Sequence, residues 1–160
     1  MAETKTLILV RHAHRSTDDP GRDNGLSDKG IEQVKKLVKF AANRLEGTRP
    51  VFLSSPKKRC VETITPIAKE FGTKPEIDSR LTEHGPQENN AVCLARIDNF
   101  LDFWKHECPQ VTVICSHGDW IPIAIQKLTD ARIGIKKAGW IEVEYSGGDA
   151  FLTWLVQKVF

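Results

Sequence analysis

Short apolar stretches alternate along the chain with longer stretches in which apolar residues recur every three or four positions. The short stretches predict four β-strands, at Thr6–Val10, Val51–Leu53, Glu76–Asp78 and Val111–Cys115. Two further stretches predict a β-hairpin around the turn residues Ser146–Gly148, with strands at Trp140–Tyr145 and Phe151–Val156. The longer stretches predict four helices, which open at Leu26–Gly30 and at Ser55 and which span Ala91–His106 and Gly118–Leu128.

Local residue types place the ends of these helices. Ser27 and Ser55 are predicted N-caps, because a serine hydroxyl accepts a hydrogen bond from a free N–H of the first turn. Pro56 is expected at the first helical position after Ser55, and Pro66 would lie inside the same helix, where proline favours a kink. The polar stretch Ser79–Asn90 predicts a loop. The helix that follows it is expected to bury Leu94, Ile97, Leu101 and Trp104 on one side.

Alternation of strands and helices is typical of a three-layer α/β/α sandwich with a mainly parallel central sheet. A chain of 160 residues is long enough for one such unit, so residues 1–160 are expected to form a single domain. In sheets of this kind, ligands bind beyond the carboxyl ends of the strands. The residues that directly follow the predicted strands are therefore the first candidates for a functional site.

Composition and charge narrow the classes of function. The formal net charge is only +2, so neither nucleic acid nor a membrane is expected as a partner. The apolar stretch Leu7–Val10 is too short to cross a membrane and has no signal-peptide cleavage site behind it. The four cysteines form no CxxC pair, which argues against a zinc site or a disulfide framework and predicts reduced thiols in a cytoplasmic protein. The sequence leaves the oligomeric state open.

Three polar clusters that are far apart in the sequence each follow a predicted strand directly. They are Arg11-His12-Ala13-His14-Arg15, Ser54-Ser55 with the following Arg59, and Ser116-His117-Gly118-Asp119. Since the carboxyl ends of parallel strands meet at one edge of a sheet, these clusters are expected to converge. A histidine next to arginines suits phosphate chemistry, because a guanidinium binds phosphate through its planar fork and a neutral imidazole can attack phosphorus. A histidine that only caps a strand end is the structural alternative.

Two residues of the later clusters occupy positions that favour an anion. Arg59 lies in the first turns of a predicted helix, where the helix dipole favours negative charge, and a bound anion would reconcile the two. His117 is placed to donate a hydrogen bond to a phosphoryl oxygen, although a histidine satisfied within the core is the alternative. Gly118 would let the backbone turn tightly and approach a ligand closely. Lys57 and Lys58 are expected to be exposed to solvent.

The ordered set of motifs resembles the histidine phosphatase superfamily, to which the phosphoglycerate mutases belong. The Arg-His-Gly, Ser-Ser-x-x-x-Arg and His-Gly motifs of that family match Arg11-His12-Ala13, Ser54–Arg59 and His117-Gly118 in this order. Leu26–Gly30 together with Gln33 resembles the family's Leu-Thr-x-x-Gly-x-x-Gln. The resemblance spans nearly the whole chain and implies a phosphoglycerate-mutase-like fold. Alanine in place of the first glycine resembles the small phosphohistidine phosphatases of the superfamily.

The resemblance also implies roles for individual residues. His12 would be the nucleophile, and Arg11, Arg59 and His117 would hold the nonbridging oxygens of the phosphoryl group. No metal ion or other cofactor is implied, because two arginines and a histidine supply the positive charge. Glu83 lies in a segment that resembles the family's Leu-x-Glu element, so it is the first candidate for the acid that protonates the leaving group.

Five further residues are predicted to contact the substrate: Arg15, Ser16, Ser55, Gly118 and Asp119. Asp119 is also the second candidate for the proton donor, by similarity to the acid phosphatase branch of the family. Arg15 resembles an additional arginine of that branch. No family role can be assigned to His14.

The predicted function is a metal-independent phosphatase that acts on a phosphorylated small molecule or on a phosphoprotein. Small size and the Arg-His-Ala motif favour protein phosphohistidine as substrate, whereas an acid at Glu83 favours phosphomonoesters, whose leaving groups need a proton. A phosphoglycerate-type mutase is less expected, because mutases of the family enclose their intermediate with long insertions and this chain is short. A catalytically silent module that binds phosphorylated ligands is the alternative from another class.

Overall fold

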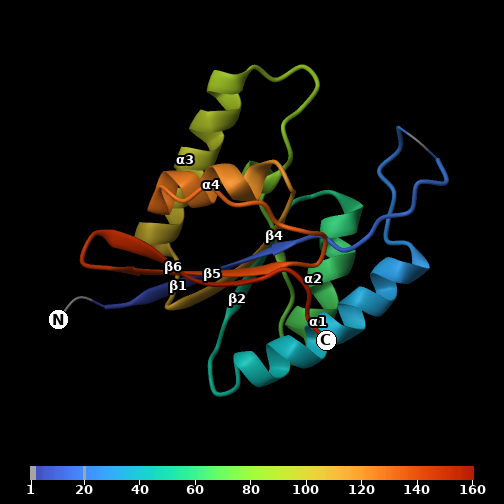
Figure 1. Ribbon diagram of the computed structural model, residues 1–160, viewed down its shortest axis with the longest axis horizontal. Helices are drawn as coiled ribbons and strands as arrows, with labels where there is room; N and C mark the ends of the chain where they lie inside the picture. The colour runs from blue at the N-terminus through green and yellow to red at the C-terminus, as the bar shows by residue number, and fades with distance from the viewer. Residues whose placement is uncertain (1–2, 20) are drawn as a thin grey trace.

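The computed structural model describes residues 3–19 and 21–160. Six strands form one sheet in the order β3-β2-β4-β1-β5-β6 (Figure 1). The first four strands in that order are parallel, and β5 and β6 run antiparallel to their neighbours. The strands are β1 Lys5–Arg11, β2 Val51–Ser54, β3 Glu76–Ile77, β4 Val111–Ser116, β5 Trp140–Ser146 and β6 Asp149–Val156.

Helices cover both faces of this sheet. They are α1 Asp28–Arg44, α2 Lys58–Glu70, α3 Asn90–Glu107 and α4 Trp120–Thr129, and a short 3₁₀ helix, η1 Ser79–Leu81, precedes α3. Figure 1 shows α1 and α2 on one face and α3 and α4 on the other. The expected three-layer α/β/α sandwich with a mainly parallel sheet is confirmed. None of the helices in the described ranges is long and apolar enough to span a membrane.

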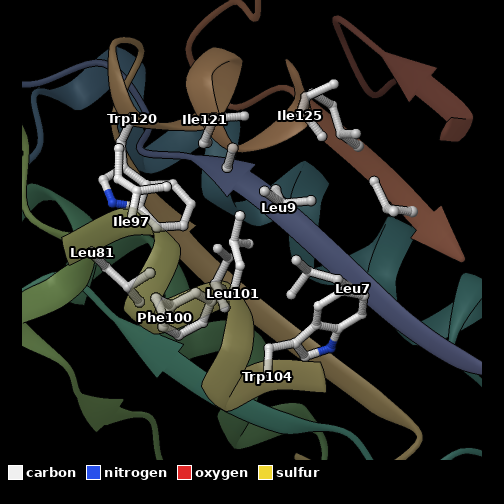
Figure 2. Close-up of a cluster of buried hydrophobic side chains, with 14 of the residues drawn as sticks. Leu7, Leu9, Leu81, Ile97, Phe100, Leu101, Trp104, Trp120, Ile121 and Ile125 are labelled. Atoms are coloured by element: carbon white, nitrogen blue, oxygen red, sulfur yellow. The ribbon is translucent and has the colours of Figure 1, made fainter. Parts of the chain in front are cut away.

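β1 lies inside the sheet and sends alternate side chains into two cores. Leu7 and Leu9 belong to the core under α3 and α4, where Leu7 lies next to Trp104 (Figure 2). Ile8 and Val10 point the other way and join the core under α1 and α2. All four β1 side chains are fully buried. A parallel strand that is covered on both faces is apolar throughout, which explains why this part of the sequence shows no alternation with polar residues.

The two serines that were predicted as N-caps behave differently. Ser27 is the N-cap of α1, and its Oγ accepts a hydrogen bond from a backbone N–H of the first turn. Ser55 does not cap α2, because the helix begins only at Lys58, whose backbone N–H donates to the Asp23 carboxylate. The prediction of Ser55 as N-cap and Pro56 as the first helical residue was therefore wrong. The Ser55 hydroxyl lies against the His117 ring instead.

The ends and buried sides of the helices differ in places from those expected from the sequence. α4 begins at Trp120, two residues later than expected, because a turn precedes it. The predicted loop before α3 contains η1. Leu94 is 39% exposed and was wrongly expected to be buried, since the buried side of α3 passes through Cys93 instead. Pro66 lies inside α2 as expected, and the helix continues on both sides of it.

The predicted hairpin is formed by β5 and β6, and its turn residues Gly147 and Gly148 both have positive φ. Glu142 in β5 is a buried carboxylate at the sheet surface under α1. It accepts two hydrogen bonds from Arg44 of α1 and one from Trp140 Nε1, all at 2.8 Å. Because a buried carboxylate is stable only when it is paired in this way, these contacts fix α1 against the hairpin.

Candidate active site

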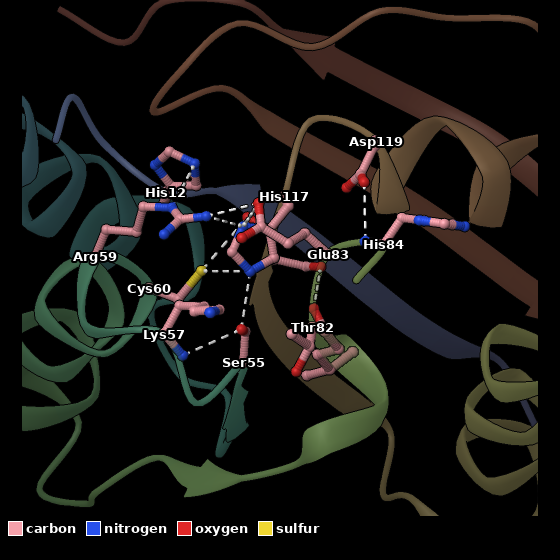
Figure 3. A network of polar contacts seen from close by, with 12 residues as sticks. His12, Ser55, Lys57, Arg59, Cys60, Thr82, Glu83, His84, His117 and Asp119 are labelled. Carbon is pink, nitrogen blue, oxygen red and sulfur yellow. Dashed lines mark hydrogen bonds and ion pairs between the residues drawn. The ribbon is translucent and has the colours of Figure 1, made fainter. Parts of the chain in front are cut away.

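The carboxyl ends of β1, β2 and β4 lie side by side and bring the three predicted polar clusters together. In the parallel register, Arg11 is paired with Ser116, and Ser54 is paired with Cys115. The pairing continues one residue beyond β1, because His12 N donates to Ser116 O at 3.1 Å. Four predicted residues meet at this edge and are called the site cluster below (Figure 3): His12, Arg59, Glu83 and His117.

The hydrogen bonds of His12 indicate which of its ring nitrogens carries the proton. Nδ1 lies 2.8 Å from the carbonyl oxygen of Ala13, so Nδ1 is the nitrogen that donates. Nε2 keeps its lone pair and accepts a hydrogen bond from Arg59 Nε at 3.3 Å. Burial, to which the charges of Arg59 and Arg11 add, lowers the pKa of His12 to about 4. The imidazole is therefore neutral near neutral pH, the form in which histidine can act as a nucleophile.

Arg59 connects the other members of the site cluster. Besides its contact with His12, its Nη2 donates to Glu83 Oε2 at 2.7 Å and lies 3.3 Å from His117 Nδ1. Its side chain is 5% exposed and belongs to the first turn of α2, where the N–H of Lys58 donates to the Asp23 carboxylate at 3.1 Å. A buried guanidinium near the positive end of a helix dipole attracts negative charge. This part of the site is therefore suited to an anion.

His117 is oriented by the hydroxyl of Ser55. Ser55 Oγ lies 2.8 Å from His117 Nε2 and also accepts a hydrogen bond from Lys57 N at 3.3 Å. Nδ1 of His117 faces the rest of the site cluster, 3.8 Å from the nearer Glu83 oxygen. Burial, reinforced by the charge of Arg59, lowers the pKa of His117 to about 2. His117 is therefore a neutral ring held in place to exchange one hydrogen bond with whatever lies between it and Arg59.

Arg11 reaches the site over Gly118. Its Nη1 donates to Ile135 O at 2.7 Å, and its Nε is buried with no hydrogen-bond partner among the described residues. A Cβ on Gly118 would lie 2.6 Å from Arg11 Cζ, so a side chain at this position would displace the guanidinium. Burial is the main influence on Arg11 and lowers its pKa. An unpartnered buried donor beside His12 is a second place where an anionic oxygen would be stabilised.

The two candidates for the proton donor have different surroundings. Glu83 contacts Arg59 directly, as described above, and its side chain is 37% exposed, so both the site and solvent can reach it. Asp119 Oδ2 instead accepts a hydrogen bond from the backbone N of His84 at 3.0 Å. Asp119 thus holds the loop that carries Glu83. Of the two carboxylates, only Glu83 contacts Arg59 in the part of the chain that the structure describes.

Arg96 of α3 also fixes this loop and was not predicted from the sequence. Its guanidinium donates to the carbonyl oxygens of Arg80, Thr82 and Glu83 at 2.9, 2.6 and 3.1 Å. It also pairs with both oxygens of Glu88, and this pairing lowers the pKa of Glu88 to about 2. The only sequence signal was that Arg96 is the single cation between residues 90 and 104. Its contacts set the position from which the Glu83 side chain enters the site.

Arg15 and Ser16 were predicted to contact the substrate but lie apart from the site cluster. Arg15 pairs with Leu26 in an isolated β-bridge. Both residues line a hollow of about 430 Å³ together with His14, whose Nδ1 lies 2.7 Å from the Ser27 hydroxyl. In the described ranges, neither residue has a hydrogen bond or ion pair with the site cluster. Contact of Arg15 and Ser16 with the substrate therefore stays a prediction.

One group of residues has the spacing of metal ligands. His84, Glu88 and Cys93 each offer an atom within 4.8 Å of the others. However, Arg96 donates to both Glu88 oxygens and lies 3.6 Å from Cys93 Sγ. A fixed positive charge thus already lies at this place, and it would oppose a second cation.

Comparison with known families places the chain by its sequence. Residues 7–90 match the sequence profile of the histidine phosphatase superfamily, branch 1. The chain belongs to this superfamily, as the motifs implied, and the expected enzyme class of phosphatase is confirmed at the level of the family. The curated proteins contain no match to the sequence.

Solved structures share the whole fold at low sequence identity. A mycobacterial hydrolase superposes with a TM-score of 0.81 at 15% identity, over 98% of this chain and 100% of that chain. A mycobacterial glucosyl-3-phosphoglycerate phosphatase gives 0.75 at 16% identity, over 98% and 100% of the two chains. A phosphoserine phosphatase of Entamoeba histolytica, solved with phosphoserine, gives 0.75 at 18% identity, over 95% and 96%. These similarities show that the fold is phosphoglycerate-mutase-like.

Proposed function

We propose that the protein hydrolyses phosphate monoesters through a phosphohistidine on His12, without a metal ion. The observation that carries the proposal is the approach of Arg59 Nε to His12 Nε2 at 3.3 Å. This contact places the lone pair of a neutral imidazole directly opposite a buried cation. A phosphoryl group held by Arg59 would present its phosphorus to the nucleophile at close range, which is the main requirement for phosphoryl transfer.

In the first step, His12 Nε2 forms a bond to phosphorus while the bond from phosphorus to the alcohol oxygen breaks. The nonbridging oxygens would be held by Arg11, Arg59 and His117, whose donors stabilise the charge in the transition state. To donate, His117 must carry its proton on Nδ1. Ser55 permits this tautomer, because its Oγ already accepts from Lys57 N and can give its own proton to His117 Nε2.

Glu83 is the proposed proton donor for the leaving alcohol. In the free protein its carboxylate is paired with Arg59. A phosphate that enters the site competes with Glu83 for Arg59, which frees the Glu83 carboxyl group to face the leaving oxygen. In its acid form, Glu83 gives its proton to that oxygen in the first step. In the second step, water attacks the phosphohistidine, Glu83 takes its proton, and inorganic phosphate leaves with His12 restored.

Several observations support ester hydrolysis over the alternatives. A carboxylic acid in the site matters most for an alcohol leaving group, whereas the imidazole of protein phosphohistidine can leave as a neutral amine. Two of the structurally similar proteins are named for phosphate esters, glucosyl-3-phosphoglycerate and phosphoserine. Only eight residues, 82–89, connect η1 to α3. So short a segment leaves water access to the site, which favours hydrolysis over the enclosed transfer of a mutase.

The test is turnover of p-nitrophenyl phosphate, phosphoserine and a phosphohistidine protein with a chelator present. We expect hydrolysis of the esters by the wild type and its loss in His12→Ala. The exposed His106 provides a matched control, because His106→Ala removes an imidazole that bonds only to its own helix. An alkaline quench during turnover of ³²P-labelled ester should trap label on His12.

Three results would contradict the proposal. Phosphate binding without turnover would identify the silent module. Transfer of label within a phosphoglycerate rather than to water would identify a mutase. If Glu83→Gln slowed hydrolysis of phosphoserine and of the phosphohistidine protein equally, or slowed neither, Glu83 would not be the proton donor.

A further inference from the structure

A basic hollow lies beside the site cluster, between the first half of α1, the loop that joins α4 to β5 and the segment after β6. Its volume is about 510 Å³, within the usual range of small-molecule pockets. Figure 1 shows the C-terminal segment next to α1, where this lining places it. Six cationic side chains line the hollow: Arg11, Lys29, Lys36, Lys136, Lys137 and Lys158. No Asp or Glu is among its described lining residues.

The lysines of the basic hollow have no carboxylate partner among the described residues. Across residues 3–19 and 21–160, the only lysines in ion pairs with carboxylates are Lys35 and Lys127, and both lie outside the hollow. The whole chain has a net charge of only +2, so overall basicity does not explain this concentration of cations. Burial and then the charges of Arg11, Arg15 and Lys29 lower the pKa of Lys137. A bound anion would relieve this repulsion.

The basic hollow adjoins the site cluster through shared residues. Arg11 lines the hollow, and its guanidinium also lies over Gly118 at the end of β4. Ala138, another lining residue, donates its N–H toward the carbonyl oxygens of both Arg11 and His12, at 3.1 and 3.2 Å. Lys137 is near enough for its charge to act on the His12 ring. A ligand with a phosphoryl group at His12 can therefore extend past Arg11 into the hollow.

We infer that the basic hollow binds a second phosphate of the substrate, so that the preferred substrate is a small ester with at least two phosphates. This inference rests on the proposed function, because it places one phosphate at His12. Lysine ammonium groups bind phosphate as point charges, and several unpaired ones favour a ligand that carries several negative charges. The concave shape favours a small molecule over the broad surface of a phosphoprotein.

A matched pair of substrates tests the inference: glucose 6-phosphate and glucose 1,6-bisphosphate. We expect kcat/KM for the bisphosphate to exceed that for the monophosphate by about tenfold or more at low salt, the scale of one or two additional charge contacts. The double variant Lys36→Ala/Lys158→Ala should remove most of this preference through a higher KM for the bisphosphate. Lys39→Ala/Lys69→Ala removes the same net charge outside the hollow and should retain the preference.

Binding and turnover together separate the two proposals. Calorimetry with inorganic tripolyphosphate needs no chemistry and should show weaker binding in Lys36→Ala/Lys158→Ala than in Lys39→Ala/Lys69→Ala. If p-nitrophenyl phosphate is hydrolysed but both sugar phosphates react alike and neither double variant changes tripolyphosphate binding, the second-phosphate site is overturned and the proposed function stands. If the Lys36→Ala/Lys158→Ala variant loses activity only on a phosphohistidine protein, the basic hollow serves a protein surface and the inference is also overturned. No turnover of any ester would overturn the proposed function instead.

Discussion

Ser55 Oγ lies 2.8 Å from His117 Nε2, and this contact links the end of β2 to the end of β4 inside the site. Because the serine hydroxyl can either accept or donate, it supports both neutral tautomers of the ring. The ring can thus accept from Arg59 in the free protein and donate to a phosphoryl oxygen in the complex. One hydroxyl therefore decides how readily His117 changes between these two hydrogen-bonding states.

Ser55→Ala is expected to lower kcat on p-nitrophenyl phosphate by roughly 10- to 100-fold, because losing a buried hydrogen bond costs about 1–3 kcal/mol and each 1.4 kcal/mol is a factor of ten. The control is Ser54→Ala, since the Ser54 hydroxyl is equally buried but bonds only to the Ser55 carbonyl. Steady-state kinetics and thermal unfolding of both variants provide the comparison. Equal losses of activity in the two variants would show that Ser55 acts through stability alone.

Gly118→Ala should displace the Arg11 guanidinium, because the new methyl group would lie 2.6 Å from Arg11 Cζ. We expect weaker binding of inorganic phosphate and a lower kcat/KM, by about tenfold or more, the cost of one lost charge-assisted hydrogen bond. Gly134→Ala is the matched control, because a Cβ at Gly134 meets nothing within 4 Å. Phosphate titration by calorimetry measures the effect directly. Unchanged phosphate affinity in Gly118→Ala would exclude Arg11 from the phosphate site.

Arg96→Ala is expected to release the loop that holds Glu83, because it removes the donor to three backbone carbonyl oxygens of this segment and to the Glu88 carboxylate. General acid catalysis contributes roughly 10²–10⁴-fold, so a displaced acid should lower kcat for phosphoserine by a part of that factor. p-Nitrophenyl phosphate should be affected much less, because nitrophenolate leaves without a proton. Arg22→Ala removes an exposed arginine and is the control. An equal loss on both substrates would mean that Arg96 supports only the fold.

Acid should destabilise the fold through the two buried histidines. Burial lowers the pKa of His12 to about 4 and that of His117 to about 2, so the unfolded chain binds more protons below the ordinary histidine pKa of about 6.5. The contribution of the two rings to the free energy of unfolding is therefore fully present above about pH 6.5. It falls as the pH drops from 6.5 toward the pKa values of the folded protein. Between about pH 7 and pH 5 the expected loss is about 2 kcal/mol for each ring.

Urea unfolding at several pH values measures this loss. His117→Asn should have a shallower dependence of unfolding free energy on pH than the wild type, whatever its absolute stability. His106→Gln changes an exposed ring and should follow the wild-type slope. A wild-type slope in His117→Asn would contradict the assignment of a buried neutral imidazole.

The sequence was most informative where one physical cause dominates. The continuous apolar run of β1 predicted a strand, and the motifs after three strands predicted that His12, Arg59 and His117 converge. Glu83 was selected by resemblance, and its contact with Arg59 agrees with that choice. For His12 and His117, position directly after a strand was enough to infer the neighbourhood.

Contacts between segments distant in sequence were not predictable in the same way. Ser55 has the residue type of a helix N-cap, but its hydroxyl hydrogen-bonds to His117, which lies 62 residues further along the chain. Arg96 looked like an ordinary surface cation of α3, because its acceptors are backbone carbonyls, which any sequence provides. The basic hollow likewise joins lysines of α1, of a loop and of the C-terminal segment, and no motif connects them.

The parallel pairing of β1 with β4, in which Arg11 is opposite Ser116, has a consequence for refolding. A slip of one residue in this register would turn His117 to the opposite face of the sheet and away from His12. Turnover after dilution from denaturant would therefore recover only when this long-range pairing is correct. Helical circular dichroism, which depends on local contacts, should return earlier, and the delay between the two signals would time the closure of the sheet.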